Sequence, residues 1–267
     1  MNQEPRQKGS TSVTGILLAI IIVLVVALVG AGLYALSFGA ISGDGDLGPV
    51  IAQDVTVEGF SAVELNGFGN LYIEQGETEA LRIEAAEKLM DRIAVEKRGD
   101  TLQIKYKSKW WIGIASLTTA EETNFYLTVK DLDSITLDGS GTINADPFNA
   151  GDLDIYITGS GEVDMNLTAD TLNSYVSGSG DFELKGEVYG QTVEISGSGD
   201  YSAVDLQSTT ALIRVSGSGK ALVNVTGTLD VDVTGSGEVT YVGTPTVTQS
   251  ISGSGNVRKI SDDLFKD

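Results

Sequence analysis

The chain has 267 residues, of which 37 are acidic and 17 basic, so its formal net charge at pH 7 is -20. A surface this acidic repels the phosphate backbone, which excludes nucleic acid as a partner. The sequence contains no histidine and no cysteine. This composition rules out Ser-His and Cys-His nucleophiles, the usual zinc sites, disulfide bonds and lipid attachment through cysteine. Only carboxylate chemistry remains. A catalytic pair needs two carboxyl groups in different environments, whereas the acids of this chain recur with its repeat, so we expect neither enzyme activity nor a cofactor.

The first predicted element is a single transmembrane helix within residues 13–40. No charged residue occurs between positions 9 and 43, and Ile16–Leu36 is almost wholly apolar. That length suits a hydrocarbon core of roughly 30 Å. Basic residues precede the span and acidic residues follow it, so the positive-inside tendency makes residues 1–12 a cytoplasmic tail and places the rest of the chain outside the cytoplasm.

A cleaved signal peptide is the alternative interpretation of this segment. Ser37 and Gly39 could serve as the small residues of a cleavage site, but the apolar stretch is longer than the usual signal core. We therefore predict that the protein is a single-pass membrane protein whose anchor is retained. Residues 41–53, which are rich in glycine and aspartate, are predicted to be a linker to the domain that follows.

Residues 54–130 contain short runs in which apolar and polar residues alternate, a pattern typical of half-buried strands. The frame around Gly67 matches that of a glycine motif that recurs further along the chain. Gly67 precedes the first of those motifs, at Gly139, by 72 residues, which corresponds to four units of 18. We therefore predict degenerate repeat units here, with an insertion at residues 105–122 where the alternation is lost.

The insertion contains Tyr106 in the lysine-flanked run 105–109, followed directly by Trp110 and Trp111, and eight of the 17 basic residues of the chain fall between positions 82 and 109. One interpretation is that these side chains contact a carbohydrate, a protein partner or the membrane interface. The alternative is that the tryptophans pack beneath a loop. An irregular loop offers a unique geometry, whereas a repeated face offers many equivalent ones, so we predict that the specific contact lies here.

Residues 131–260 contain Gly-Ser-Gly seven times, at intervals of 18 to 20 residues. Apolar residues stand two positions before and four positions after the first glycine of every copy. This alternation predicts short strands with the glycines at the bends. Units of this length are too short for a propeller blade and lack the frame of a leucine-rich repeat. The pattern therefore predicts an all-β fold, a parallel β-helix with one rung per repeat. Residues 261–267 are predicted to cap its C-terminal end.

The same alternation predicts an outward face of hydroxyl and carboxylate groups, because neighbouring rungs lie roughly 4.8 Å apart and like side chains form ladders. Stacked carboxylates suit Ca²⁺, and the weak candidates for such a site are Glu162, Asp181, Asp200 and Glu238. Lys220 interrupts this column, and the glycine-rich nonapeptide of calcium-binding β-rolls is missing. We therefore expect a solvated face and no metal site.

Several segments together resemble one known family. They are the start Val57–Leu65, the turn Gly67–Asn70, the run Leu102–Tyr106, the strand Phe125–Val129 and the serial Ser-Gly-Ser-Gly rungs that end in Asp or Glu. In combination they resemble the family of putative auto-transporter adhesins with a head GIN domain, over about residues 54–260. The resemblance implies a bacterial cell-envelope protein with a right-handed parallel β-helix. The family supplies no functional residues that can be transferred.

The expected function is that of an adhesin-like binding or display surface on an extracytoplasmic β-helix, with a cell-surface glycan or an envelope protein as partner. One alternative is a structural or self-assembling envelope protein, since the ends of a solenoid expose strand edges. A carbohydrate-active enzyme is the other alternative, because β-helices can carry pairs of catalytic carboxylates. The sequence leaves the ligand, the oligomeric state and the envelope type open.

Overall fold

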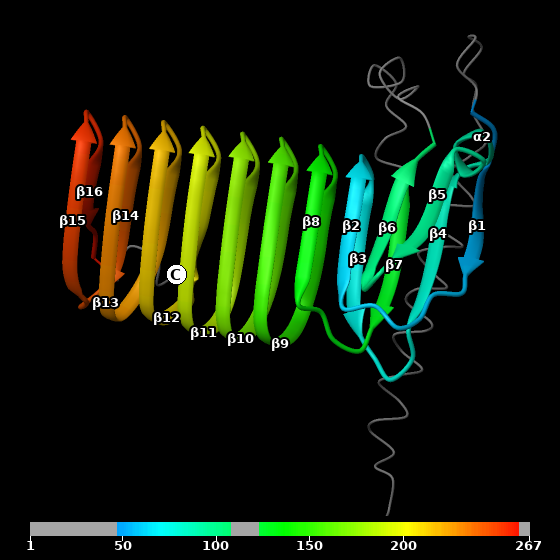
Figure 1. The fold of residues 1–267 in the computed structure, drawn as a ribbon, viewed down its shortest axis with the longest axis horizontal. Helices are drawn as coiled ribbons and strands as arrows, with labels where there is room; N and C mark the ends of the chain where they lie inside the picture. The colour runs from blue at the N-terminus through cyan, green and yellow to red at the C-terminus, as the bar shows by residue number, and fades with distance from the viewer. Residues whose placement is uncertain (1–46, 108–122, 262–267) are drawn as a thin grey trace, which may run out of the picture. The chain divides into compact units, whose positions relative to one another are not determined.

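A row of long parallel strands dominates the chain from Val50 onward, as Figure 1 shows. The structure, a computed structural model, describes residues 47–107 and 123–261. Each long strand bends once, so that its first half lies on one face of a β-solenoid and its second half on the other. We call these the first and the second face. The long strands are β9 (Thr142–Gly159), β10 (Glu162–Gly178), β11 (Asp181–Gly197), β12 (Asp200–Gly217) and β13 (Lys220–Gly235).

The long strands pair in parallel with the repeat units in register, so each Gly-Ser-Gly motif stands next to the same motif of the neighbouring rung. Gly178, for example, pairs with Gly159 on one side and with Gly197 on the other. The apolar residue two positions before each motif points inward, and Ile157, Val176 and Ile195 are each at most 2% exposed. Burial of such columns drives stacking by about 25 cal/mol per Å² of apolar surface. The prediction of one parallel rung per repeat is therefore confirmed.

The glycine corner depends on a close approach between rungs. Gly178 has φ +127°, and a β-carbon there would lie 2.5 Å from the carbonyl oxygen of Gly159. That oxygen accepts a hydrogen bond of 2.8 Å from the N–H of Ser179, and an equivalent bond is made by the central serine of every copy. A side chain at Gly178 would need both a disfavoured φ and the space of this oxygen. The first glycine of the motif is therefore required by the backbone.

The solenoid contains a buried polar network. The Tyr201 hydroxyl donates to Gln191 Oε1 at 2.9 Å, and Gln191 Nε2 donates to Ser208 Oγ at 2.7 Å. Ser208 Oγ in turn donates to the backbone oxygen of Asn224 at 3.0 Å. Desolvation raises the pKa of Tyr201, while the neighbouring Ser174 hydroxyl lowers it by less. These bonds satisfy polar groups that would otherwise be costly to bury.

The N-terminal part of the solenoid differs from the predicted series of four degenerate rungs. Gly67 lies directly beside Gly139, although 72 residues separate them in the chain. The strands that carry Gly67 and Asn70 pair with the first regular rung, and a second pair of parallel strands lies on their other side. These elements are β2 (Ala62–Gly67), β3 (Asn70–Gln75), β6 (Thr101–Tyr106), β7 (Asn124–Val129) and β8 (Ser134–Gly139).

The remaining residues of this region form an antiparallel end of the sheet, which the period of the sequence did not predict. Strand β4 pairs antiparallel with β7 and with β1, and β5 pairs antiparallel with β6. A short helix, α2, buries Leu89 and Met90. The predicted linker is therefore too long, because its last four residues belong to β1. The elements are β1 (Val50–Val55), β4 (Ala80–Ala86), α2 (Glu87–Met90) and β5 (Ile93–Arg98).

The opposite end of the stack is formed by β14 (Glu238–Gly243), β15 (Thr246–Gly253) and β16 (Asn256–Lys259). Ile251 is the last of the inward apolar residues that stand two positions before a Gly-Ser-Gly motif, and it is 41% exposed. The predicted cap at 261–267 lies outside the described residues except for Ser261. The predicted tail and span, with Ile16–Leu36, also lie outside them. Within residues 47–107 and 123–261, no helix is both long and apolar enough to cross a membrane.

Candidate functional site

The predicted stripe of hydroxyl and carboxylate groups is present on the outside of the solenoid. The central serine of each motif is exposed, and so is the Ser or Thr directly before the motif in most rungs. On the first face, the residues just after the motif form a column in which Glu162 stands next to Asp181. The N–H of Asp200 donates to Asp181 Oδ1 at 2.9 Å, so one carboxylate of the column bonds to the backbone of the next rung.

The four calcium candidates do not form one acidic cluster. Asp200 lies 4.0 Å from the Nζ of Lys220, and Glu238 accepts a hydrogen bond of 2.6 Å from Arg258 Nε. Two of the four carboxylates are thus paired with a cation. In the part of the chain that the structure describes, no group of three or more Asp, Glu, His or Cys side chains is arranged to hold a metal ion. The absence of a calcium site stays a prediction.

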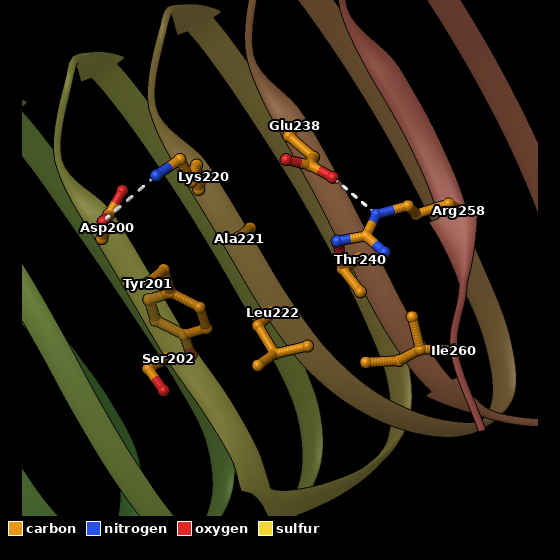
Figure 2. A pocket seen from close by; sticks show the side chains of 10 residues that line it. All are labelled: Asp200, Tyr201, Ser202, Lys220, Ala221, Leu222, Glu238, Thr240, Arg258 and Ile260. Atoms are coloured by element: carbon orange, nitrogen blue, oxygen red, sulfur yellow. Dashed lines mark hydrogen bonds and ion pairs between the residues drawn. The ribbon is translucent and has the colours of Figure 1, made fainter. Parts of the chain in front are cut away.

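A shallow depression of about 340 Å³ lies on the first face near the C-terminal end of the stack, and Figure 2 shows the residues around it. Its charged side chains come from successive rungs and alternate in sign. Three residues with a hydroxyl group and three apolar residues complete the lining. In chain order the lining residues are Asp200, Tyr201, Ser202, Lys220, Ala221, Leu222, Glu238, Thr240, Arg258 and Ile260.

The depression arises where two outward columns change character. Leu222 is the outward residue of its rung, yet its neighbours in the adjacent rungs are Ser202 and Thr240. Ser202 has a small side chain and Thr240 is only 7% exposed, whereas Leu222 between them is half-buried (Figure 2). The sequence pattern showed that Lys220 interrupts the acidic column. It did not show that Leu222, two residues later, interrupts the neighbouring column of polar residues. The coincidence of these two exceptions in one rung is the signal that marks the depression.

Tyrosine side chains form two exposed stacks elsewhere on the solenoid. On the second face, Tyr156 and Tyr175 are register partners in adjacent rungs, with ring centroids 4.7 Å apart and ring planes 7° from parallel. The pKa of both phenols is raised, first by partial desolvation and then by the Asp154 carboxylate. On the first face, Tyr72 and Tyr126 stack with centroids 5.3 Å apart. Since these rings stack between rungs, they cover one another's faces and hold neighbouring rungs together.

The predicted binding segment is described only in part. The Tyr106 ring lies against Gly67, where an added β-carbon would be 2.8 Å from it, and it stacks on Phe68 with centroids 4.3 Å apart. Its hydroxyl donates to the backbone oxygen of Phe68 at 3.2 Å, and burial raises its pKa. Tyr106 is thus a packing residue at the corner where the insertion replaces the glycines. Trp110 and Trp111 lie outside the described residues, so a contact through them stays a prediction.

Three of the basic side chains near the insertion are paired with acids. Lys105 Nζ lies 2.8 Å from Glu96, a carboxylate that Arg98 also contacts at 3.1 Å. The hydrogen bond from Lys105 is the main cause that lowers the pKa of Glu96. Arg82 contacts Glu84 at 3.1 Å. These pairs reduce the positive charge that the sequence count assigned to this patch.

Comparison with known proteins identifies the family. The profile described as "Putative auto-transporter adhesin, head GIN domain" matches residues 59–245. The chain belongs to this family. No curated protein matches it. The match begins after β1 and ends before β15, so Arg258 and Ile260 of the depression lie beyond it.

Solved structures of other bacterial proteins share the fold of this adhesin-family chain. A putative adhesin from Bacteroides fragilis is 25% identical, with a TM-score of 0.74 over 79% of this chain and 97% of that one. A putative lipid binding protein from Parabacteroides distasonis is also 25% identical, with a TM-score of 0.62 over 82% and 99% of the two chains. A putative adhesin from the same species, at 21% identity and a TM-score of 0.62 over 80% and 98%, shows the fold alone.

Proposed function

We propose that this protein is an adhesin-like binding protein that displays its solenoid at the outer side of the cell envelope. The observation that carries the proposal is the family match over residues 59–245, together with a similarity that covers 97% of the chain described as a putative adhesin from Bacteroides fragilis. Because the similarity covers nearly all of that chain, the two proteins share the solenoid along its length. A solenoid suits this role, since stacked rungs expose extended lateral faces.

The proposal includes a membrane anchor. The apolar stretch Ile16–Leu36 is long enough to span a bilayer, and the charges on either side of it favour a cytoplasmic N-terminus. The protein would then be a single-pass membrane protein with the solenoid outside the cytoplasm. Right-handed winding of the rungs, which the family resemblance implies, belongs to the same proposal.

A binding role without catalysis agrees with the residue inventory. The sequence contains no histidine or cysteine. The serine of the repeated motif occurs seven times in equivalent, exposed positions, which is not how a single nucleophile is built. The exposed carboxylates also recur from rung to rung, whereas an acid and base pair requires two carboxyl groups in different environments.

The proposal is tested with the purified full-length chain in a detergent that contains no sugar. The chain is applied to a glycan array and, separately, used to capture proteins from a solubilised envelope fraction. We expect saturable binding to at least one glycan or envelope protein. Vesicles of neutral and anionic lipid form a third arm, because one similar structure is described as lipid binding. Binding to vesicles alone, with none in the other two arms, would contradict the adhesin assignment.

The tryptophan pair is tested in the same assays. If the insertion makes the specific contact, replacing Trp110 and Trp111 together by Ala should abolish binding and leave the urea unfolding midpoint unchanged. Collapse of the fold would instead assign the tryptophans to packing. Survival of both folding and binding would place the contact elsewhere on the solenoid.

Self-assembly is the second candidate function, and the exposed last rung favours it. Among the described residues, strand β15 pairs only with β13, which leaves its other edge open, and Ile251 is 41% exposed there. An open edge is a template for another strand. Sedimentation of the full-length chain over a dilution series distinguishes the two functions. Oligomers that persist on dilution would favour assembly, whereas a monomer that retains its ligand would favour binding.

A further inference from the structure

We propose that the depression on the first face is a saccharide site that holds one or two neutral sugar units, with Leu222 as its apolar floor. This inference rests on the proposed function and gives that function a location and a ligand class. The volume of about 340 Å³ falls at the lower end of the range of about 300–1,000 Å³ seen for ligand pockets. A small ligand or the end of a longer chain is therefore the appropriate size.

The charge of the depression favours a neutral ligand. Residues 131–261 include 18 acidic and 5 basic residues, a net charge of -13. Inside the depression, however, Asp200 and Glu238 are balanced by Lys220 and Arg258. An anionic ligand would approach through the repulsive field of the surrounding rungs, and a cationic ligand would have to compete with Lys220 and Arg258, which already pair with the two carboxylates. A neutral polar ligand meets neither obstacle.

The polar groups of the depression match hydroxyl groups, which both donate and accept hydrogen bonds. Carboxylates accept, ammonium and guanidinium groups donate, and the hydroxyl of the half-buried Ser202 does both. The two ion pairs run along the same side of the depression in Figure 2, Lys220 with Asp200 and Arg258 with Glu238. The Lys220 pair is long, at 4.0 Å, so both partners keep bonding capacity for a ligand. Charged partners of this kind form the stronger hydrogen bonds.

The apolar part of the depression lies opposite these ion pairs. Leu222 and Ile260 are half-buried, and Figure 2 shows both on the side of the depression away from the charged ends. A sugar ring has C–H groups on its faces and hydroxyls around its rim. A ring placed on Leu222 would therefore bury its apolar face while its rim reached the charged groups. Most other outward positions on this face carry polar side chains, so the combination belongs to this rung.

The test uses the full-length chain and methyl glycosides of glucose, galactose, mannose and N-acetylglucosamine as probes, followed by isothermal titration. Leu222→Ser removes the apolar floor, and Glu238→Gln removes one acceptor. Glu162→Gln is the matched control, because Glu162 occupies the same outward column outside the depression. We expect at least one glycoside to bind, and both depression variants to weaken it by about tenfold or more, which corresponds to about 1.4 kcal/mol. The control should bind as the parent does.

Three results would overturn the inference. The first is that none of the four glycosides binds although the chain still binds cells or envelope protein, in which case the proposed function stands and this site does not. The second is binding that neither depression variant weakens, with unfolding midpoints equal to that of the parent. The third is equal weakening by Glu162→Gln, which would assign the effect to the charge of the whole face. Absence of all binding would refute the proposed function as well.

Discussion

Replacing Gly178 by Ala tests the physical basis of the repeat, since it adds a single carbon at the corner. The β-carbon would lie 2.5 Å from the Gly159 carbonyl oxygen, and the residue would keep φ near +127°. A disfavoured backbone conformation costs about 1–3 kcal/mol. Moving the carbonyl also weakens the 2.8 Å bond from Ser179 N–H, which contributes about 0.5–1.5 kcal/mol. We therefore expect the free energy of unfolding to fall by about 2–4 kcal/mol.

Three matched variants separate the causes. Gly151 has open space around its α-carbon and no positive φ, so Gly151→Ala should be neutral or slightly stabilising. Gly99 has φ +61° but also open space, so Gly99→Ala should show only the conformational cost of about 1–2 kcal/mol. Ser179→Ala removes an exposed hydroxyl beside the corner and should stay within about 0.5 kcal/mol of the parent.

The assay is urea unfolding of the full-length chain, followed by far-ultraviolet circular dichroism. The expected order of destabilisation is Gly178→Ala, then Gly99→Ala, then Gly151→Ala and Ser179→Ala together. Two results would refute the reasoning. If Gly178→Ala were no worse than Gly99→Ala, the close approach to the Gly159 oxygen would contribute nothing. If Ser179→Ala cost more than Gly178→Ala, the corner would depend on its hydroxyl ladder and not on its backbone.

Three further predictions concern the core, the metal and the anchor. Tyr201→Phe should lower the free energy of unfolding by about 1–3 kcal/mol, because Gln191 loses a buried partner, whereas exposed Tyr72→Phe should not. Burial raises the pKa of Tyr201 in the folded state, so the contribution of its neutral side chain to the free energy of unfolding is fully present below about pH 10 and is lost as the pH rises above it. If the stability of Tyr201→Phe fell equally steeply with rising pH, this assignment would be contradicted. Micromolar Ca²⁺ should not raise the melting temperature beyond the effect of Na⁺ at equal ionic strength, and a specific rise would restore the carboxylate column as a calcium site. Intact mass of the mature protein should include the N-terminal span, and a start near Ala40 would mean that the segment is cleaved.

The regular rungs could be predicted from the sequence because each contributes the same local signals. Alternation fixes which side chains point inward, and the glycine motif marks the corner, so Ile157, Val176 and Ile195 were correctly assigned to the core. Local periodicity cannot reveal which rung a strand joins. The interval of 72 residues between Gly67 and Gly139 fits four rungs arithmetically, yet the two glycines are neighbours. Antiparallel strands alternate with the same period of two as parallel ones, so β4 and β5 gave no sign of their direction.

The candidate site was harder to predict for a related reason. A repeat pattern identifies the residue types that recur at each position. The depression instead depends on two residues that depart from that pattern, Lys220 and Leu222, and their outward neighbours are known only once the strand register is known. Leu222 looks like an ordinary apolar residue in the sequence, and its outward position follows from its pairing with Ser202 and Thr240. Tyr106 shows the converse, because its aromatic ring looked available but packs on Phe68. The environments of Leu222 and Tyr106 are both set by residues of neighbouring rungs, which the sequence pattern of a single rung does not reveal.

The most direct test of the central claim is the adherence of intact cells that carry the full chain, compared with cells that lack it. The surfaces are coated in parallel with glycans, envelope protein and an uncoated control, and protease treatment of whole cells verifies that the solenoid is exposed. The account predicts greater adherence of the carrying cells to at least one coated surface. Equal adherence of both kinds of cell to every surface, with the solenoid verified at the exterior, would contradict it.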